Sequence, residues 1–179
     1  MKKIVLLLVS IFTLSQVDAQ IQYSTPNTNS TQPIATVDKL SGPRVGLTVI
    51  SNGGLKDGIE DIFGVSTNVM TQFGYQFEKQ MMGDENVAGL IETIILIGGI
   101  EQGMFIPSAS FLFGARFAKG TEFAIGPNLS FSGAALVFAA GKTIKAGDIN
   151  IPINVAWVPS TQGSGHRFTA TIGFNFRSY

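Results

Sequence analysis

Apolar and polar residues alternate along five segments of the chain. In the last of them, apolar side chains occupy every second position from Phe168 to Phe176, with polar or small residues between them. Successive side chains of a β-strand point to opposite faces, so this pattern predicts a strand with one apolar and one polar face. The other four segments with this pattern are 69–78, 108–117, 122–131 and 148–157.

Three further segments carry a weaker alternation and bring the number of predicted strands to eight. They are 44–50, 90–97 and 134–143. The small residues of the last segment leave its parity open. The longest connection, 51–68, contains a stretch at 55–63 that is predicted to form one or two helical turns. Pro127 and Pro152 each remove a backbone N–H from a ladder, so we expect both prolines to mark β-bulges.

The N-terminus has the three parts of a secretory signal peptide. Lys2 and Lys3 are followed by an apolar run and by Val17-Asp18-Ala19, which matches a small-x-Ala cleavage site. We therefore expect residues 1–19 to be a signal peptide that directs export. Residues 20–42 are rich in Gln, Ser, Thr, Asn and Pro and predict a disordered tail. Residues 43–179 are predicted to form the folded domain.

Composition narrows the class of protein. Charged residues make up 13% of the chain, and twelve basic residues balance twelve acidic ones. This balance provides no excess of positive charge for nucleic acid. The absence of cysteine excludes disulfides and thiolate metal sites. No segment after the signal reaches the eighteen consecutive apolar residues of a spanning helix. An exported, apolar chain of this kind fits a closed β-barrel, because closure satisfies every backbone polar group within lipid.

The size of the side chains on the two faces indicates which face meets lipid. The apolar face carries Phe and Ile on strand after strand, whereas the other face carries Gly, Ser, Asn, Gln and Ala. An eight-stranded barrel has an interior that holds side chains and little else. A soluble lipocalin-like barrel, which would place the bulky set inside, is therefore the less favoured alternative. The predicted fold is all-β: a closed, antiparallel, up-and-down transmembrane barrel of about eight strands, each long enough to cross a bilayer.

Charged and amide side chains on the inward face are expected to form a hydrogen-bonded plug, in which arginine pairs with carboxylates. A gated polar path for ions is the alternative use of the same residues. The predicted interior network consists of Arg44, Gln72, Gln76, Glu78, Glu92, Arg116, Glu122, Asn128 and Arg167.

Aromatic residues are predicted to mark the two membrane interfaces. Four phenylalanines fall at one rim and the single tryptophan falls at the other, if both termini and the short turns lie in the periplasm. The predicted interface residues are Phe77, Phe117, Phe123, Phe176 and Trp157.

Candidate chemistry is sparse. Gly141-Lys142-Thr143 resembles the end of a phosphate-binding loop, but Leu136 stands where that motif requires glycine. His166 is the only histidine, which excludes a histidine-based metal cluster, and it lies in a glycine-containing loop. An acidic group near position 60 lacks the spacing of a calcium loop. We expect no enzyme activity, no cofactor and no metal site.

The strand number, the parity and the aromatic terminal strand resemble the small outer-membrane β-barrel families exemplified by the OmpA barrel and OmpX. The Gly- and Phe-rich style around 126–130 is also similar to a Bacteroidota-type family of such barrels. The resemblance implies an outer-membrane location, contact with outer-membrane lipid and recognition of a terminal aromatic residue by the insertion machinery. Either Phe176 serves this purpose, or a bulge brings Tyr179 into phase. We expect a structural or interaction role, with other envelope proteins as partners; the alternative is a barrel that passes or binds a small solute.

Overall fold

The computed structural model describes residues 40–83, 86–146 and 149–176. The predicted signal peptide, residues 20–39 of the predicted tail and Tyr179 lie outside the described residues. The elements are β1 (Gly42–Ile50), α2 (Gly54–Phe63), β2 (Val69–Gly83), β3 (Val87–Gly98), the 3₁₀ turn η2 (Ile100–Gln102), β4 (Ile106–Phe117), β5 (Thr121–Ser130), β6 (Gly133–Ala146), β7 (Ile149–Val158), β8 (Arg167–Gly173) and β9 (Asn175–Phe176).

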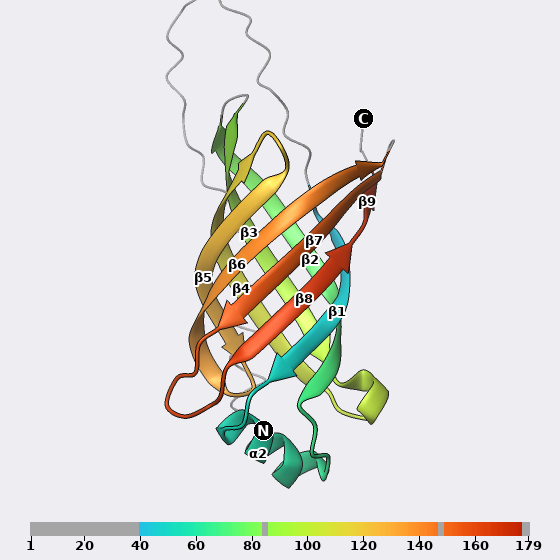
Figure 1. Ribbon diagram of the computed structural model, residues 1–179, viewed down its shortest axis with the longest axis vertical. Helices are drawn as coiled ribbons and strands as arrows, with labels where there is room; N and C mark the ends of the chain where they lie inside the picture. The colour runs from blue at the N-terminus through green and yellow to red at the C-terminus, as the bar shows by residue number, and fades with distance from the viewer. Residues whose placement is uncertain (1–39, 84–85, 147–148, 177–179) are drawn as a thin grey trace, which may run out of the picture. The chain divides into compact units, whose positions relative to one another are not determined.

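The strands form a closed antiparallel barrel (Figure 1). Consecutive strands pair from β1 to β8, and β8 pairs with β1 to complete the ring. β9 continues β8 in the same register, because Ile153 lies opposite Ile172 and Ile149 lies opposite Phe176. The wall therefore has eight strands, as predicted. We call the end that carries α2 and η2 the helix end, and the end at which β1 begins the tail end.

The alternation predicted from the sequence is present in the strands. In β5, buried and exposed residues alternate from Glu122 to Leu129, with Phe123 and Ile125 outside and Asn128 inside. In β6, whose parity the sequence left open, Val137 points inward and Phe138 outward. The large apolar side chains thus cover the outer face, and the polar side chains fill the interior.

The prediction that the two prolines mark bulges is wrong. The β4–β5 ladder is interrupted beside Pro127, yet the pairs Ser110–Asn128 and Phe113–Ile125 keep one register. The β6–β7 register likewise runs unchanged through Pro152. On the other side of β7, the pairing with β8 and β9 is interrupted beside Pro152, between Ile153 and Asn150, and again one register is kept. Neither interruption adds a residue. A register shift occurs instead in β2, between Gln80 and Met82.

The residue before Pro127, Gly126, lies unusually close to the neighbouring strand. A Cβ atom at Gly126 would lie 2.0 Å from the carbonyl oxygen of Phe111 on the neighbouring strand. Such a close approach of two backbones is open only to glycine. The register on both sides of the Gly126-Pro127 pair is preserved.

A lid covers the helix end of the barrel. The stretch predicted to form helical turns is α2, and its Leu55 and Ile59 are buried against Ile50, Met70 and neighbouring apolar residues. Gly64 ends the helix in the left-handed conformation. No helix in the described part of the chain is long and apolar enough to span a membrane.

The last residues of the predicted tail belong to the barrel. β1 begins at Gly42, two residues before the predicted start, and Leu40 is 1% exposed. The folded domain therefore begins earlier than its predicted boundary at residue 43, because Leu40 and Ser41 have partners inside the tail end.

Candidate functional site: the polar interior

The main ionic group of the interior is centred on Arg116 of β4. Its Nε donates to Glu122 Oε2 of β5 at 2.7 Å, and its Nη1 donates to Glu78 Oε1 of β2 at 2.7 Å. Nη2 forms ion pairs with both carboxylates. The side chains of all three residues are at least nine-tenths buried. Three strands are thus joined through one guanidinium group.

A second arginine, Arg44 of β1, binds neutral groups. Its Nε donates to Gln76 Oε1 at 3.1 Å, and its Nη1 donates to Asn175 Oδ1 at 3.1 Å and to the carbonyl oxygen of Pro43 at 3.0 Å. Its Nη2 donates to the carbonyl oxygen of Leu40 at 2.6 Å. Arg44 therefore connects β1, β2 and β9 with the segment that precedes the barrel.

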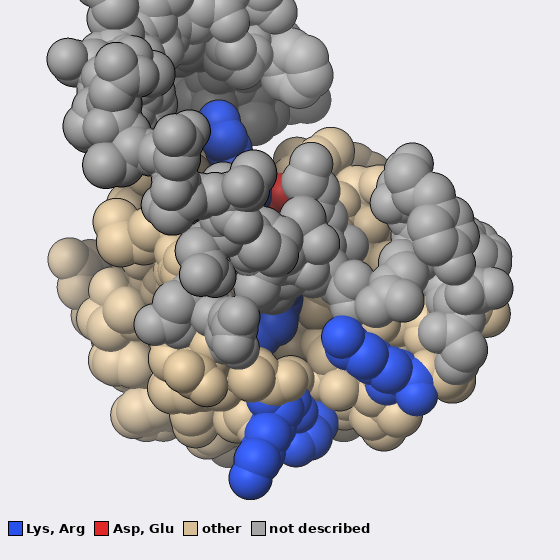
Figure 2. All heavy atoms as spheres, turned by 90° about the horizontal axis from the view of Figure 1, so that it is seen from above, with Lys and Arg blue, Asp and Glu red and all other residues tan. Residues whose placement is uncertain are grey.

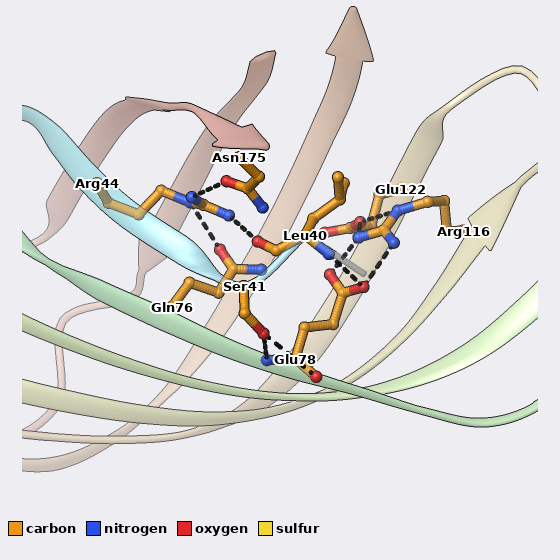
Figure 3. Close-up of polar contacts among 8 residues, drawn as sticks. All are labelled: Leu40, Ser41, Arg44, Gln76, Glu78, Arg116, Glu122 and Asn175. Atoms are coloured by element: carbon orange, nitrogen blue, oxygen red, sulfur yellow. Dashed lines mark hydrogen bonds and ion pairs between the residues drawn. The ribbon is translucent and has the colours of Figure 1, made fainter. Parts of the chain in front are cut away.

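That segment lies inside the tail end, between the two arginine groups (Figure 3). The backbone N–H of Leu40 donates to Glu78 Oε1 at 3.2 Å, and the backbone N–H of Glu78 donates to Ser41 Oγ at 2.8 Å. Leu40 thus lies between the two arginine groups, with its carbonyl on Arg44 and its amide on Glu78. We call this arrangement of Leu40 and Ser41 the inner plug.

A third group lies further toward the helix end. Arg167 of β8 donates to Ser130 Oγ at 2.7 Å and to Asn128 Oδ1 at 2.9 Å. Asn128 in turn donates to Ser110 Oγ at 2.9 Å. The hydroxyls of Thr48 and Thr169 share a hydrogen bond of 2.7 Å between β1 and β8.

Two interior side chains retain an unused acceptor. Glu92 Oε1 and Gln72 Oε1 are buried without a hydrogen-bond partner among the described residues. Oxygens of Glu78, Glu92 and Glu122 lie within 4.8 Å of one another, which is close enough to hold a hard cation. Arg116 already pairs with Glu78 and Glu122, so a cation there would have to compete with its guanidinium group for two of the three carboxylates. The remaining cavity, about 90 Å³, has room for a few water molecules.

The structure thus places the nine predicted network residues inside the barrel, in three arginine-centred groups with Gln72 and Glu92 beside them. Sequence reasoning missed Leu40, Ser41 and the lid. Alternation identifies residues within a strand, and Leu40 precedes the first strand. An isolated leucine in a polar tail was the only signal.

Four of the five predicted interface aromatics lie on the outer face. Phe117 and Phe123 contact each other at the tail end with ring centres 6.4 Å apart, and the ring of Phe77 lies 4.7 Å from that of Tyr75. Trp157, near the helix end of β7, stacks on Phe138. Phe176 pairs with Ile149 through its backbone, and its side chain lies outside the described residues.

Loop residues at the helix end form further polar contacts. His166 Nδ1 accepts a hydrogen bond from the backbone N–H of Ser160 at 3.2 Å, and its ring stacks on Trp157. The hydroxyl of Thr71 and its backbone N–H donate to Glu101 and lower the pKa of that carboxyl. These contacts hold the loops to the barrel.

Comparison with known proteins gives one distant likeness. The barrel is similar to the crystal structure of Ail, the attachment invasion locus protein of Yersinia pestis, with 11% identity over 79% of this chain and 100% of that one and a TM-score of 0.29. This likeness is too distant to assign a role. No family model matches the chain, and the search of curated proteins found no relative.

Proposed function

We propose that the chain is an integral outer-membrane β-barrel with a sealed interior, which serves as a structural or interaction component of the cell envelope. The observation that carries this proposal is the distribution of the side chains. Phenylalanine, isoleucine and valine are exposed around the outer face, where water would penalise them, while arginine and glutamate are buried inside. A bilayer is the solvent that suits this inverted arrangement.

Two closures support a sealed interior over the alternative of a barrel that passes or holds a small solute. The lid covers the helix end with Leu55 and Ile59, and the inner plug occupies the tail end with Leu40. Between them, the arginine groups join strands across the interior. We propose no catalytic step for the barrel. Its partners would be outer-membrane lipid, the insertion machinery and other envelope proteins, reached through the loops or the tail.

Planar-bilayer recording tests the sealed interior. Wild-type protein, shown to be inserted by flotation of the same vesicles and by a heat-modifiable band, is expected to give no steady current steps at either sign of the potential. Uniform, reproducible steps would contradict a sealed interior and would favour the ion-passing alternative.

Native co-purification after mild solubilisation separates the two structural roles. A stoichiometric complex supports an accessory subunit, and a lone barrel supports a free-standing envelope protein.

A further inference from the structure

The outer face of the barrel contains a groove that its large side chains leave open. It has a volume of about 810 Å³ and crosses strands β4 to β8. Its floor is formed by Ala115 and Ala140, which belong to one row of paired residues: Ala115 pairs with Phe123, Phe123 with Ala140, and Ala140 with Val155. We call this feature the outer groove.

Aromatic rings form the wall of the outer groove toward the helix end. Phe138, Trp157 and Phe168 form a stacked ridge, with ring centres 5.6 and 6.3 Å apart. Phe123, which lies between the two alanines in the paired row, is 56% exposed and projects from the floor. The volume lies within the range of ~300–1,000 Å³ that is common for ligand sites. Such a narrow, apolar depression between rings fits a hydrocarbon chain.

Two lysines lie on the tail-end side of the outer groove, outside its lining. Lys142 follows Ala140 on the same outward face of β6, and Lys119 lies in the turn between β4 and β5. The backbone N–H of Thr143 donates to the carbonyl oxygen of Gly120 at 2.9 Å, so the residues that follow the two lysines are directly bonded. The backbones that carry the two lysines are therefore close together, and Lys142 Nζ donates to Thr121 Oγ1 at 3.5 Å.

Among the described residues, no carboxylate forms an ion pair with Lys119 or Lys142 at this rim, and both lysines are exposed. The nearest acidic residue in the strands, Glu122, points inward and is bonded to Arg116. Figure 2 views the barrel from this end and shows basic side chains at the edge of the tan surface. A phosphate group is the complement to such a pair of ammonium groups at a membrane interface.

We propose that the outer groove with Lys119 and Lys142 is a binding site for one anionic phospholipid, with an acyl chain against Ala140 and the phosphate on the two lysines. The inference rests on the proposed function, because it requires the outer face to lie in lipid. The dimensions agree. Phe138 and its partner Trp157 are four residues from Lys142 along the strand, or about 13 Å, and the tilt of the strand reduces this depth to on the order of 10 Å. That depth lies within one leaflet, which is about 15 Å thick.

The single tryptophan of the chain lines the outer groove and provides the readout. The protein is reconstituted into phosphatidylcholine vesicles that contain a small fraction of either phosphatidylglycerol or phosphatidylcholine brominated at mid-chain. Quenching of Trp157 then reports which lipid occupies the site. We expect brominated phosphatidylglycerol to quench Trp157 as strongly as brominated phosphatidylcholine at about fivefold or more its concentration. High salt is expected to reduce this preference.

Matched variants separate the phosphate contact from the groove. Lys119→Gln with Lys142→Gln is expected to abolish the preference, whereas Lys79→Gln, on the outward face of β2, is expected to retain it. Ala140→Phe fills the floor and is expected to reduce the preference, whereas Ala109→Phe, lipid-facing but outside the groove, leaves it unchanged. Equal quenching by the two lipids in the wild type, or a preference that survives the double lysine change, overturns the site.

A second tryptophan position distinguishes failure of the site from failure of the proposed function. In the variant Phe73→Trp with Trp157→Phe, the probe lies on the outer face of β2, away from the groove. If neither lipid quenches Trp157 but both quench this variant, another molecule such as a second copy covers the groove, and the lipid site is wrong. If neither lipid quenches either protein, the outer face does not contact lipid, and the proposed function is wrong as well.

Discussion

At the scale of residues, the three interior arginines differ in the groups that they bind. Arg116 lies between two carboxylates, whereas Arg44 and Arg167 bind amide, hydroxyl and carbonyl oxygens. A buried carboxylate that loses its ion-pair partner still carries the free-energy cost of its desolvation. Removal of Arg116 would leave two carboxylates with this cost and without the ion pair that offsets it. Removal of Arg167 leaves only neutral acceptors without a donor. An unpaired neutral acceptor costs less free energy than an unpaired buried carboxylate.

Arg116→Ala is therefore expected to lower the free energy of unfolding by about 3–5 kcal/mol. Arg167→Ala, the matched change of an interior arginine, is expected to cost on the order of 2 kcal/mol. Urea unfolding of the reconstituted barrel, followed by its heat-modifiable band, measures both. Adding Glu78→Gln and Glu122→Gln to Arg116→Ala should recover part of the loss. An Arg116 variant that is no less stable than the Arg167 variant would contradict an interior dependent on ion pairs.

At this scale the sequence predicts which residues face inward but not which residues meet. The period of two in a strand assigned Arg116, Glu78 and Glu122 to the interior without any knowledge of the register. Their contact depends on the relative position of three strands, which no local pattern contains. Leu40 illustrates the same limit more strongly, because its backbone groups bind the side chains of Arg44 and Glu78, contacts that no local pattern around residue 40 predicts.

At the scale of elements, the helix that covers the barrel is held by its apolar side. Ile59 is fully buried in the lid, whereas Ile62, three residues further on, is 62% exposed. The two isoleucines share one helix and one residue type and differ only in burial. The same substitution at the two positions therefore separates the contribution of packing to the stability of the lid from that of helix propensity.

Ile59→Ala is expected to destabilise the lid by about 2–4 kcal/mol, because it removes buried apolar volume next to Met70 and Ile106. Ile62→Ala is expected to change the lid little. Hydrogen exchange of the α2 amides in the reconstituted protein provides the measurement, with faster exchange expected for the Ile59 variant alone. Equal exchange in both variants would show that α2 is not anchored through Ile59.

The elements also show where a local rule fails. The strands and α2 follow from periodicity, since each buries one face. The prediction for Pro127 failed because a missing N–H can be accommodated by a gap in the ladder, with Gly126 allowing the backbones to approach, and does not require an inserted residue. The sequence cannot distinguish a gap from a bulge, because both begin with the same missing donor.

At the scale of the whole barrel, the account depends on an inverted distribution of polarity. Bulky apolar side chains face outward, and small or charged ones fill the centre. Strand β5 presents this distribution most regularly, since its residues alternate between buried and exposed from Glu122 to Leu129. The chain contains no cysteine, so single cysteines can be introduced along β5 without a background.

Spin labels at successive positions 123–129 of the reconstituted barrel test this distribution most directly. Labels at Ile125 and Leu129 are expected to be accessible to oxygen, which partitions into lipid, and protected from a water-soluble nickel complex. Labels at Ala124 and Asn128 are expected to be protected from both. A period of two in oxygen accessibility, with the outward positions high, agrees with lipid at the outer face. Outward positions that collide freely with the nickel complex would show that water surrounds the barrel, and would contradict the account.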